Sequence, residues 1–260
     1  MRLHRLREAI CRIGESLFSR GYVHATAGNI SVRLSSEEGG GYLITPTDAC
    51  LGRLDPAQLS HLDDELRLLS GERPSKTIVL HQRIYASATR FDPATRCVIH
   101  THSTHCVALS LLGTSRSGVE STAQSDPPSD QDWIPPITPY FVMKVGHVPL
   151  IPYHRPGDPV VADRVEQAIL HWGARGAPIR AVMLDRLGPN VWHNSPQAAM
   201  ATLEELEETA RLCLMTQPRL PAQRPANRPE GSQAPKGDQA LQALDAAQID
   251  ELRQAFGARW

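Results

Sequence analysis

The sequence predicts an α/β fold built on a mixed or largely antiparallel sheet. Helical and strand-like hydrophobic patterns alternate along the chain, and the first strand-like segments are joined by short turns, as in hairpins. Hydrophobic residues make up 41% of the 260 residues, which is enough for a core and excludes a disordered chain. The formal net charge of -1 gives no electrostatic basis for a nucleic acid or an anionic membrane as partner.

The N-terminal part of the chain predicts one helix followed by two strand pairs. Residues 2–20 carry apolar groups at helical spacing, and Gly21 ends this helix. Residues 30–34 alternate apolar and polar side chains, which is typical of a half-buried strand. Residues 42–45 are expected to form the returning strand after a glycine-rich turn, and residues 60–71 a second pair.

The remaining pattern extends the same alternation and then changes in composition. Further helices are expected at 75–89, 104–112, 163–172 and 196–216, and strands at 97–102, 148–151 and 181–184. Residues 114–134 are polar and contain Pro-Pro, which predicts a loop. Residues 217–240 are rich in Pro, Arg and Gln, so we expect a main domain at 1–216, a disordered linker, and a C-terminal helix within 241–260.

The cysteines and the length of the apolar segments indicate the cellular compartment in which the protein is expected. The five cysteines are odd in number and form no CxxC pair, so we expect free thiols rather than a disulfide framework or a cysteine zinc site. No run of about 18 apolar residues occurs, so no membrane-spanning helix is expected. The first residues lack the apolar block of a signal peptide, and the expected localisation is cytoplasmic.

Two histidines lie two positions apart in a predicted strand. Side chains at i and i+2 project to the same face, so His100 and His102 could bind one divalent ion such as zinc. Ordinary polar packing is the alternative, because a single HxH pair has low specificity. Other histidines could add a ligand or be unrelated to the site: His81, His105, His147, His154 and His193.

Two further segments could bind an anion. Gly28 and Asn29 lie at a strand entry, where glycine allows close approach and free N–H groups suit an anion, although a plain turn has the same composition. Ser75 and Lys76 precede a helix, where a hydroxyl and a cation suit a phosphate or a carboxylate. A helix cap with a solvated lysine is the alternative there. Tyr140 has a phenol that could transfer a proton, or one that is only hydrogen-bonded in the core.

Several longer runs together resemble one enzyme family. They are TAGNISVR (26–33), LITPTDACLGRLDP (43–56), PSK with LHxxIY (74–85), VIHTHSTHCVALS (98–110), PITPYFVMKVGHVPLIPYHRPGD (136–158) and LEELEETARL (203–212). These runs resemble the class II aldolase/adducin family, closest to its bacterial 3-oxo-tetronate 4-phosphate decarboxylase branch. The resemblance covers about residues 5–216.

The resemblance implies a three-layer αβα fold with a central, mostly antiparallel sheet, and a homotetramer with active sites between subunits. It implies a metal-dependent lyase that converts a phosphorylated 3-oxo sugar acid to dihydroxyacetone phosphate. The implied cofactor is Zn²⁺ or a similar divalent ion, one per subunit, held by three histidines of which two map onto His100 and His102. The implied substrate and phosphate positions are Gly28, Asn29, Thr47, Ser75 and Lys76.

The chain departs from the family pattern at three positions. Thr77 follows Pro-Ser-Lys where the family has the glutamate that acts in proton transfer, and threonine is no general base near neutral pH. Leu187 stands where the third histidine is expected, so the third ligand is open, with His193 as the candidate and Asp185 or Asp48 as other possibilities. Asp48 replaces the glycine of a Thr-Pro-Thr-Gly turn and adds negative charge near the expected phosphate site.

These departures leave three functional hypotheses. The first is the metal-dependent decarboxylase. The second is a catalytically degenerate binding or scaffold protein on the same fold, because Thr77 and Leu187 remove a base and a ligand. The third is shifted chemistry, such as an epimerase or an aldolase that acts on a substrate without phosphate.

Overall fold

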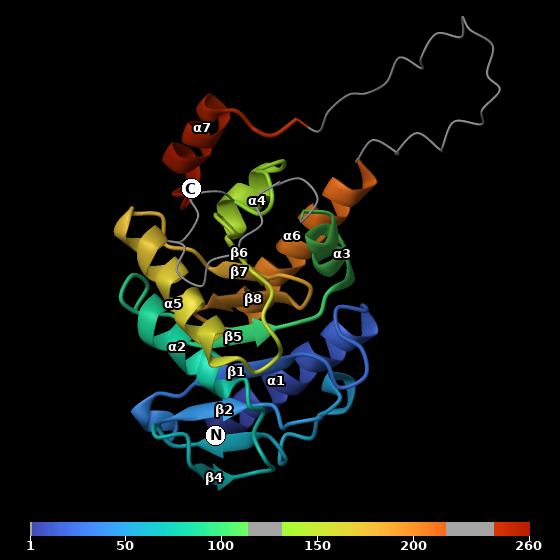
Figure 1. Ribbon diagram of the computed structural model, residues 1–260. Coiled ribbons are helices and arrows are strands. Elements are labelled where there is room, and N and C mark those ends of the chain that lie inside the picture. The colour runs from blue at the N-terminus through green and yellow to red at the C-terminus, as the bar shows by residue number, and fades with distance from the viewer. Residues whose placement is uncertain (1, 114–131, 217–241) are drawn as a thin grey trace, which may run out of the picture.

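The computed structural model describes residues 2–113, 132–216 and 242–260. Within them, one eight-stranded sheet forms the centre of the molecule, in the order β4-β3-β2-β1-β5-β8-β7-β6 (Figure 1). Every pairing is antiparallel except that of β6 with β7. The strands are β1 (Asn29–Arg33), β2 (Tyr42–Ile44), β3 (Ser60–Leu62), β4 (Leu68–Ser70), β5 (Cys97–His100), β6 (Leu150–Ile151), β7 (Ala181–Leu184) and β8 (Gly188–His193).

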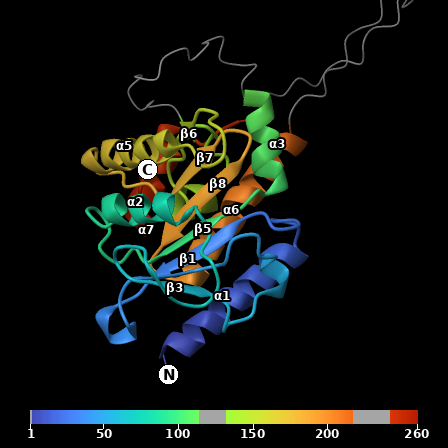
Figure 2. The same cartoon turned by 60° about the horizontal axis from the view of Figure 1, so that its bottom comes forward.

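Helices cover both faces of this sheet (Figures 1 and 2). They are α1 (Arg2–Ser19), α2 (Ile78–Ala88), α3 (Thr104–Gly113), α4 (Pro139–Lys144), α5 (Pro159–Ala174), α6 (Pro196–Met215) and α7 (Ala246–Phe256). One apolar cluster packs α1, α3, α4 and α6 against one face, and a second packs α2 and α5 against the other. The expected αβα layers and mostly antiparallel sheet are therefore confirmed.

Local sequence signals explain where three of the helices begin. The hydroxyl of Thr138 accepts from the N–H of Phe141, and the helices after Asp158 and Ser195 are capped in the same way by those side chains. In each case proline follows the cap, where its missing N–H costs no helical hydrogen bond.

The sequence pattern missed β8 and α4. Gly188 and Pro189 read as a turn, but in the structure Pro189 pairs with Met183 in the ladder, and its carbonyl oxygen accepts from the N–H of Thr101 at 3.2 Å. The six residues of α4 are too few to display a helical period. Strand β5 also ends at His100, so His102, which the predicted strand 97–102 included, lies beyond the observed strand.

The C-terminal segment packs against the body of the fold. Helix α7 begins after Asp245, which forms a capping box with Gln248. The Trp260 ring stacks on His147, with ring centroids 4.2 Å apart, and the other face of that imidazole stacks on Trp172 at 4.0 Å. The predicted 217–240 linker and most of the 114–134 loop lie outside the described residues.

The described helices differ from membrane-spanning helices. None of them combines the length and the apolar content that crossing a bilayer requires.

Candidate active site

A row of buried polar side chains crosses three neighbouring strands at the centre of the sheet. Asn29 on β1 pairs with His100 on β5, which pairs in turn with Asn190 on β8. All three residues are buried, and cross-strand partners project to the same face. Two residues before His100 on the same strand, and therefore on the same face, Val98 pairs with Trp192. Both belong to the apolar cluster under α2 and α5. The polar row therefore faces α2.

The rings of His100 and His102 lie together. Their centroids are 5.0 Å apart with an interplanar angle of 65°. Two imidazoles that bind one ion at metal–nitrogen distances of about 2.0–2.1 Å have ring centres roughly 5 Å apart, so this separation suits a shared ion. His102 lies in the short segment between β5 and α3, so the strand period used in the prediction does not account for this proximity.

Both rings are neutral near neutral pH. The Nδ1 of His100 lies 3.0 Å from the carbonyl oxygen of Pro189, which can only accept, so Nδ1 donates and Nε2 keeps its lone pair. Burial, with a contribution from His102, lowers the pKa of His100 to about 3. Burial and then the neighbouring His24 lower the pKa of His102. Neutral imidazole is the form that binds a metal ion.

His24 is a neighbour that the sequence analysis did not single out. Its ring lies 6.3 Å from that of His102, edge to face, and it is exposed in the loop before β1. No helix or strand pattern relates position 24 to position 102. The signal that could have found it is its place two residues before the TAGN run.

His81 on α2 provides a second buried imidazole above the polar row. Its Nδ1 lies 2.7 Å from the hydroxyl of Ser31, which lies 2.7 Å from the hydroxyl of Tyr85. Burial, with a contribution from His100, lowers the pKa of His81 to about 3. In the part of the chain that the structure describes, its buried Nε2 has no hydrogen-bond partner, and the same holds for both polar atoms of the Asn190 side chain. The His81 Nε2 and the Asn190 amide are thus polar groups next to His100 that could hydrogen-bond to a ligand.

The residues predicted for the phosphate come from segments that meet before α2. The Nδ2 of Asn29 donates to the Thr77 hydroxyl at 3.0 Å, and that hydroxyl lies 2.9 Å from the hydroxyl of Ser75. The N–H of Ser75 donates to the carbonyl of Thr45 at 3.3 Å. Helix α2 begins here, and the positive end of its dipole favours an anion, although the N–H groups of Thr77 and Ile78 already donate to Ser75.

Three further predicted residues flank these segments. The N–H of Thr47 donates to the carbonyl of Arg73 at 2.9 Å, which holds the 45–47 turn next to the start of α2. Lys76 is exposed beside Ser75. Gly28 has φ +83, and a Cβ there would lie 2.9 Å from the carbonyl oxygen of His100, so only glycine fits this approach to β5.

The structure also places the three departures from the family pattern. The Thr77 hydroxyl is hydrogen-bonded to Asn29 and Ser75, which gives it a positioning contact and no acid–base partner. Leu187 packs against the apolar cluster on the α2 face, where it offers no donor atom. Asp48 is exposed with φ +57, a backbone conformation that glycine adopts freely and aspartate tolerates.

Other histidines considered as a third ligand lie away from His100 and His102 or pair with a carboxylate. His193 pairs with Cys97, three residues along the strands from the pairing of His100 with Asn190, or roughly 10 Å away. The Nδ1 of His105 contacts Glu207 at 2.8 Å, and that of His147 contacts Asp132 at 2.7 Å. Tyr140 is 63% exposed at the start of α4.

The donor atoms around His100 and His102 determine whether the site fits a divalent ion. The pair His100 and His102 fits one, since both rings are neutral and suitably spaced. No set of three or more His, Cys, Asp or Glu side chains gathers to hold a metal ion in the ranges 2–113, 132–216 and 242–260. The residues present therefore fit an ion with two protein donors and do not fit a three-histidine site.

The comparison with known families decides the assignment. The sequence profile of the class II aldolase and adducin N-terminal domain matches residues 8–214. The chain belongs to the class II aldolase and adducin family. This match spans the fold from α1 to α6 and includes the whole polar row. Members of this family generally depend on a divalent metal ion.

Two curated relatives carry the same enzyme name. The chain is 47% identical over 256 residues to the 3-oxo-tetronate 4-phosphate decarboxylase of Cupriavidus necator, with 98% of each chain covered. It is 37% identical over 248 residues to the enzyme of that name from Escherichia coli K12, with 95% of each covered.

Solved structures agree on the architecture. The crystal structure of YgbL from Escherichia coli superimposes with a TM-score of 0.72 at 36% identity, covering 97% of this chain and all of that one. The L-fuculose-1-phosphate aldolase of Thermus thermophilus gives a TM-score of 0.59 at 25% identity, covering 81% of this chain and 93% of that one.

Proposed function

We propose that this member of the family is a lyase that decarboxylates 3-oxo-tetronate 4-phosphate to dihydroxyacetone phosphate. The observation that carries the proposal is the 47% identity to a decarboxylase of this name over 98% of both chains. The site described above supplies groups suited to each end of such a substrate, with neutral imidazoles at one end and an anion-binding helix start at the other.

Decarboxylation of this substrate needs few acid–base groups on the protein. The bond between C1 and C2 breaks, CO₂ leaves, and the electron pair forms an enediolate whose negative charge rests on the C3 oxygen. C2 then takes up a proton. Because the departing carboxylate is already ionised, bond cleavage requires no general base, whereas retro-aldol cleavage requires removal of a hydroxyl proton. Thr77 in place of an acidic residue is thus compatible with decarboxylation.

His100 and His102 would hold the divalent ion, Zn²⁺ or a similar one, with one ion per subunit. When bound, the ion supplies Lewis acidity that stabilises the enediolate oxygen. The hydrogen bond to Pro189 orients His100, and Gly28 lets the β1 loop lie against the backbone of that histidine. The unpartnered Nε2 of His81 and the side chain of Asn190 leave hydrogen-bonding groups beside His100 for substrate oxygens.

The phosphate end is proposed to lie at the start of α2. Gly28, Asn29, Thr47, Ser75 and Lys76 surround the point where three segments meet, and phosphate bound there would fix the register of the reacting carbons. The exposed Tyr140 remains a candidate for proton transfer to C2 only if another subunit lies against it. A homotetramer in the cytoplasm is part of this proposal.

Replacing Lys76 with alanine is expected to raise KM about tenfold while kcat changes little. The ammonium group binds the phosphate equally in the ground and transition states, so its loss removes uniform binding. Lys144→Ala, at another exposed lysine, is the matched control and should leave KM unchanged. Steady-state release of CO₂ measures both constants, and an unchanged KM in K76A would contradict the phosphate assignment.

Introducing the missing histidine is expected to strengthen metal binding. Leu187→His places a third imidazole in the turn before β8, on the face of the polar row, and should raise zinc affinity by about a hundredfold or more. Loss of apolar packing should cost about 1–2 kcal/mol of unfolding free energy. Competition with a chromophoric chelator measures the affinity, and Leu187→Asn, of similar size but without an imidazole, is the control. Equal affinities in the histidine variant and the wild type would place position 187 outside the metal site.

A catalytically degenerate binding protein is the second candidate, and Leu187 and Thr77 favour it. The two candidates differ in one measurement: production of dihydroxyacetone phosphate from 3-oxo-tetronate 4-phosphate by protein reconstituted with zinc. Turnover that depends on His100 supports the lyase. Tight substrate binding without turnover supports the binding protein.

A further inference from the structure

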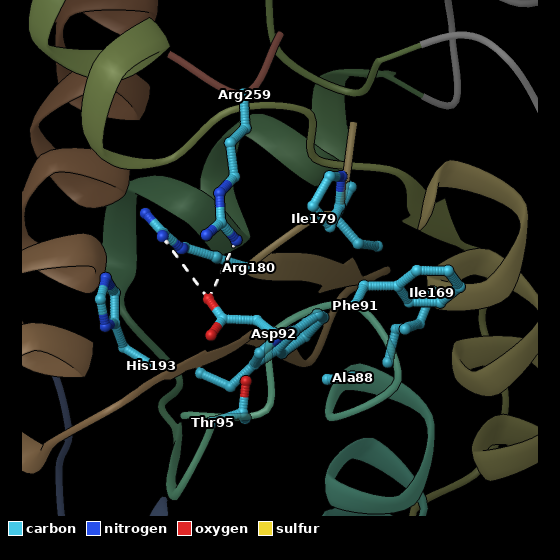
Figure 3. A pocket seen from close by; sticks show the side chains of 11 residues that line it. Ala88, Phe91, Asp92, Thr95, Ile169, Ile179, Arg180, His193 and Arg259 are labelled. Carbon is cyan, nitrogen blue, oxygen red and sulfur yellow. Dashed lines mark hydrogen bonds and ion pairs between the residues drawn. The ribbon is translucent and has the colours of Figure 1, made fainter. Parts of the chain in front are cut away.

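A second cluster of charged groups lies at the opposite end of β5 and β8 from the polar row. Asp92, Arg180, His193 and Arg259 line a pocket whose apolar wall includes Phe91 and Ile179. Figure 3 shows both guanidinium groups directed toward the Asp92 carboxylate, with the His193 ring beside them. Arg180 precedes β7, whereas Arg259 is brought in by the segment after α7.

Positive charge exceeds negative charge in this pocket. Both arginines contact one oxygen of one carboxylate, with Arg259 at 2.9 Å and Arg180 at 3.7 Å from the Oδ2 of Asp92. The His193 ring is neutral near neutral pH, because burial and then Arg180 lower its pKa. One carboxylate thus faces two guanidinium groups.

Arg180 is also short of hydrogen bonds. Its side chain is only 19% exposed, its Nε is buried with no partner among the described residues, and its contact with Asp92 is too long for a hydrogen bond. A guanidinium group that is withdrawn from water normally has its donors satisfied by a carboxylate or a phosphate. Arg180 therefore has hydrogen-bond donors that the described residues do not use.

We propose that this pocket binds a small phosphate-type oxyanion between Arg180 and Arg259. Two guanidinium groups that arrive from different directions suit an oxyanion with several acceptor oxygens. The site is shared between the core and the C-terminal segment, so it is complete only when that segment is docked. Anion binding therefore stabilises docking of residues 257–260 and α7, and docking raises affinity for the anion by the same factor.

The test must separate this site from the proposed active site, which also binds phosphate. The protein used is the full chain carrying Ser75→Ala and Lys76→Ala, titrated calorimetrically with inorganic phosphate at constant ionic strength. We expect one phosphate to bind in this background. Arg180→Gln and Arg259→Gln should each weaken its affinity about tenfold or more, since each removes a charge-assisted contact. Acetate in place of phosphate distinguishes a general carboxylate site from a phosphate site.

Arg253→Gln is the matched control, because Arg253 lies on α7 and pairs only locally with the exposed Asp250 in the described structure. It should bind phosphate like the background. Circular dichroism establishes that each variant is folded. The absence of phosphate binding in the background, or affinities that Arg180→Gln and Arg259→Gln leave unchanged, would overturn the proposal and leave the cluster as an ion pair that only anchors the segment.

Hydrogen exchange supplies an independent readout. Phosphate should slow amide exchange in a peptide covering residues 246–260 in the background protein, and should not do so in Arg180→Gln. That variant leaves the contact between Arg259 and Asp92 in place. Equal protection by phosphate in both proteins would show that the anion acts elsewhere.

Discussion

Replacing both His100 and His102 with alanine is expected to remove bound metal and to lower kcat/KM by about 10³-fold or more. The pair provides the described protein donors for a divalent ion, and Lewis-acid stabilisation of an enediolate is worth several kcal/mol. Elemental analysis of the purified protein and CO₂ release measure the two effects. In the wild type, a chelator should also lower the melting temperature, because an ion that binds the folded state stabilises it.

His4→Ala is the matched control for this variant. His4 is an exposed histidine on α1 that pairs locally with Glu8, so its loss should leave metal content and turnover intact. The His100 substitution also removes one of the two hydrogen bonds to the Pro189 carbonyl, which keeps the N–H of Thr101, so the double variant should be about 1 kcal/mol less stable for a reason unrelated to metal. A double variant that retains full metal content and full turnover would refute the proposed role of the pair.

Replacing Gly188 with alanine is expected to destabilise the fold by about 4 kcal/mol or more. Gly188 has φ +129, and a Cβ there would overlap the carbonyl oxygen of Thr101 and lie 3.1 Å from the Cα of His102. Both contacts are to backbone, which cannot move aside without separating β8 from the loop that follows β5. Chemical denaturation measures the loss.

Gly176→Ala separates backbone strain from this overlap. Gly176 also has a positive φ, +75, but a Cβ there meets nothing within 4 Å. The control variant should therefore lose only about 1 kcal/mol, the cost of an L-residue in the left-handed region. Equal losses in the two variants would mean that the close approach of β8 to Thr101 contributes nothing to stability.

The sequence anticipated most of the fold because its elements are locally encoded. Helix 2–20 is confirmed as Arg2–Ser19 and helix 196–216 as Pro196–Met215, each with the apolar spacing that predicted it. The strand Gly188–His193 was missed, because its glycine and proline are turn residues in most contexts. Its pairing with β5 and β7 satisfies its backbone, and no local pattern records such pairing.

Part of the candidate site could be predicted because two of its residues are close together in the chain. His100 and His102 are neighbours in the chain, so their proximity could be predicted even though β5 ends between them. Asn190 could not be found, because it meets His100 only through the register of β8. That register also separates His193 from the pair and assigns it to the pocket with Arg180 and Arg259.

The family, the alternation of helices and strands, and the pair of neighbouring histidines follow from residues that are close together in the chain, so local patterns were enough to predict them. Three other features could be seen only in the folded chain: Leu187 contacts apolar side chains, Asn29 and Asn190 flank His100, and Arg259 contacts Asp92. These relations join residues that are far apart in the chain, and they depend on strand register and on docking of the last segment, which no local spacing encodes.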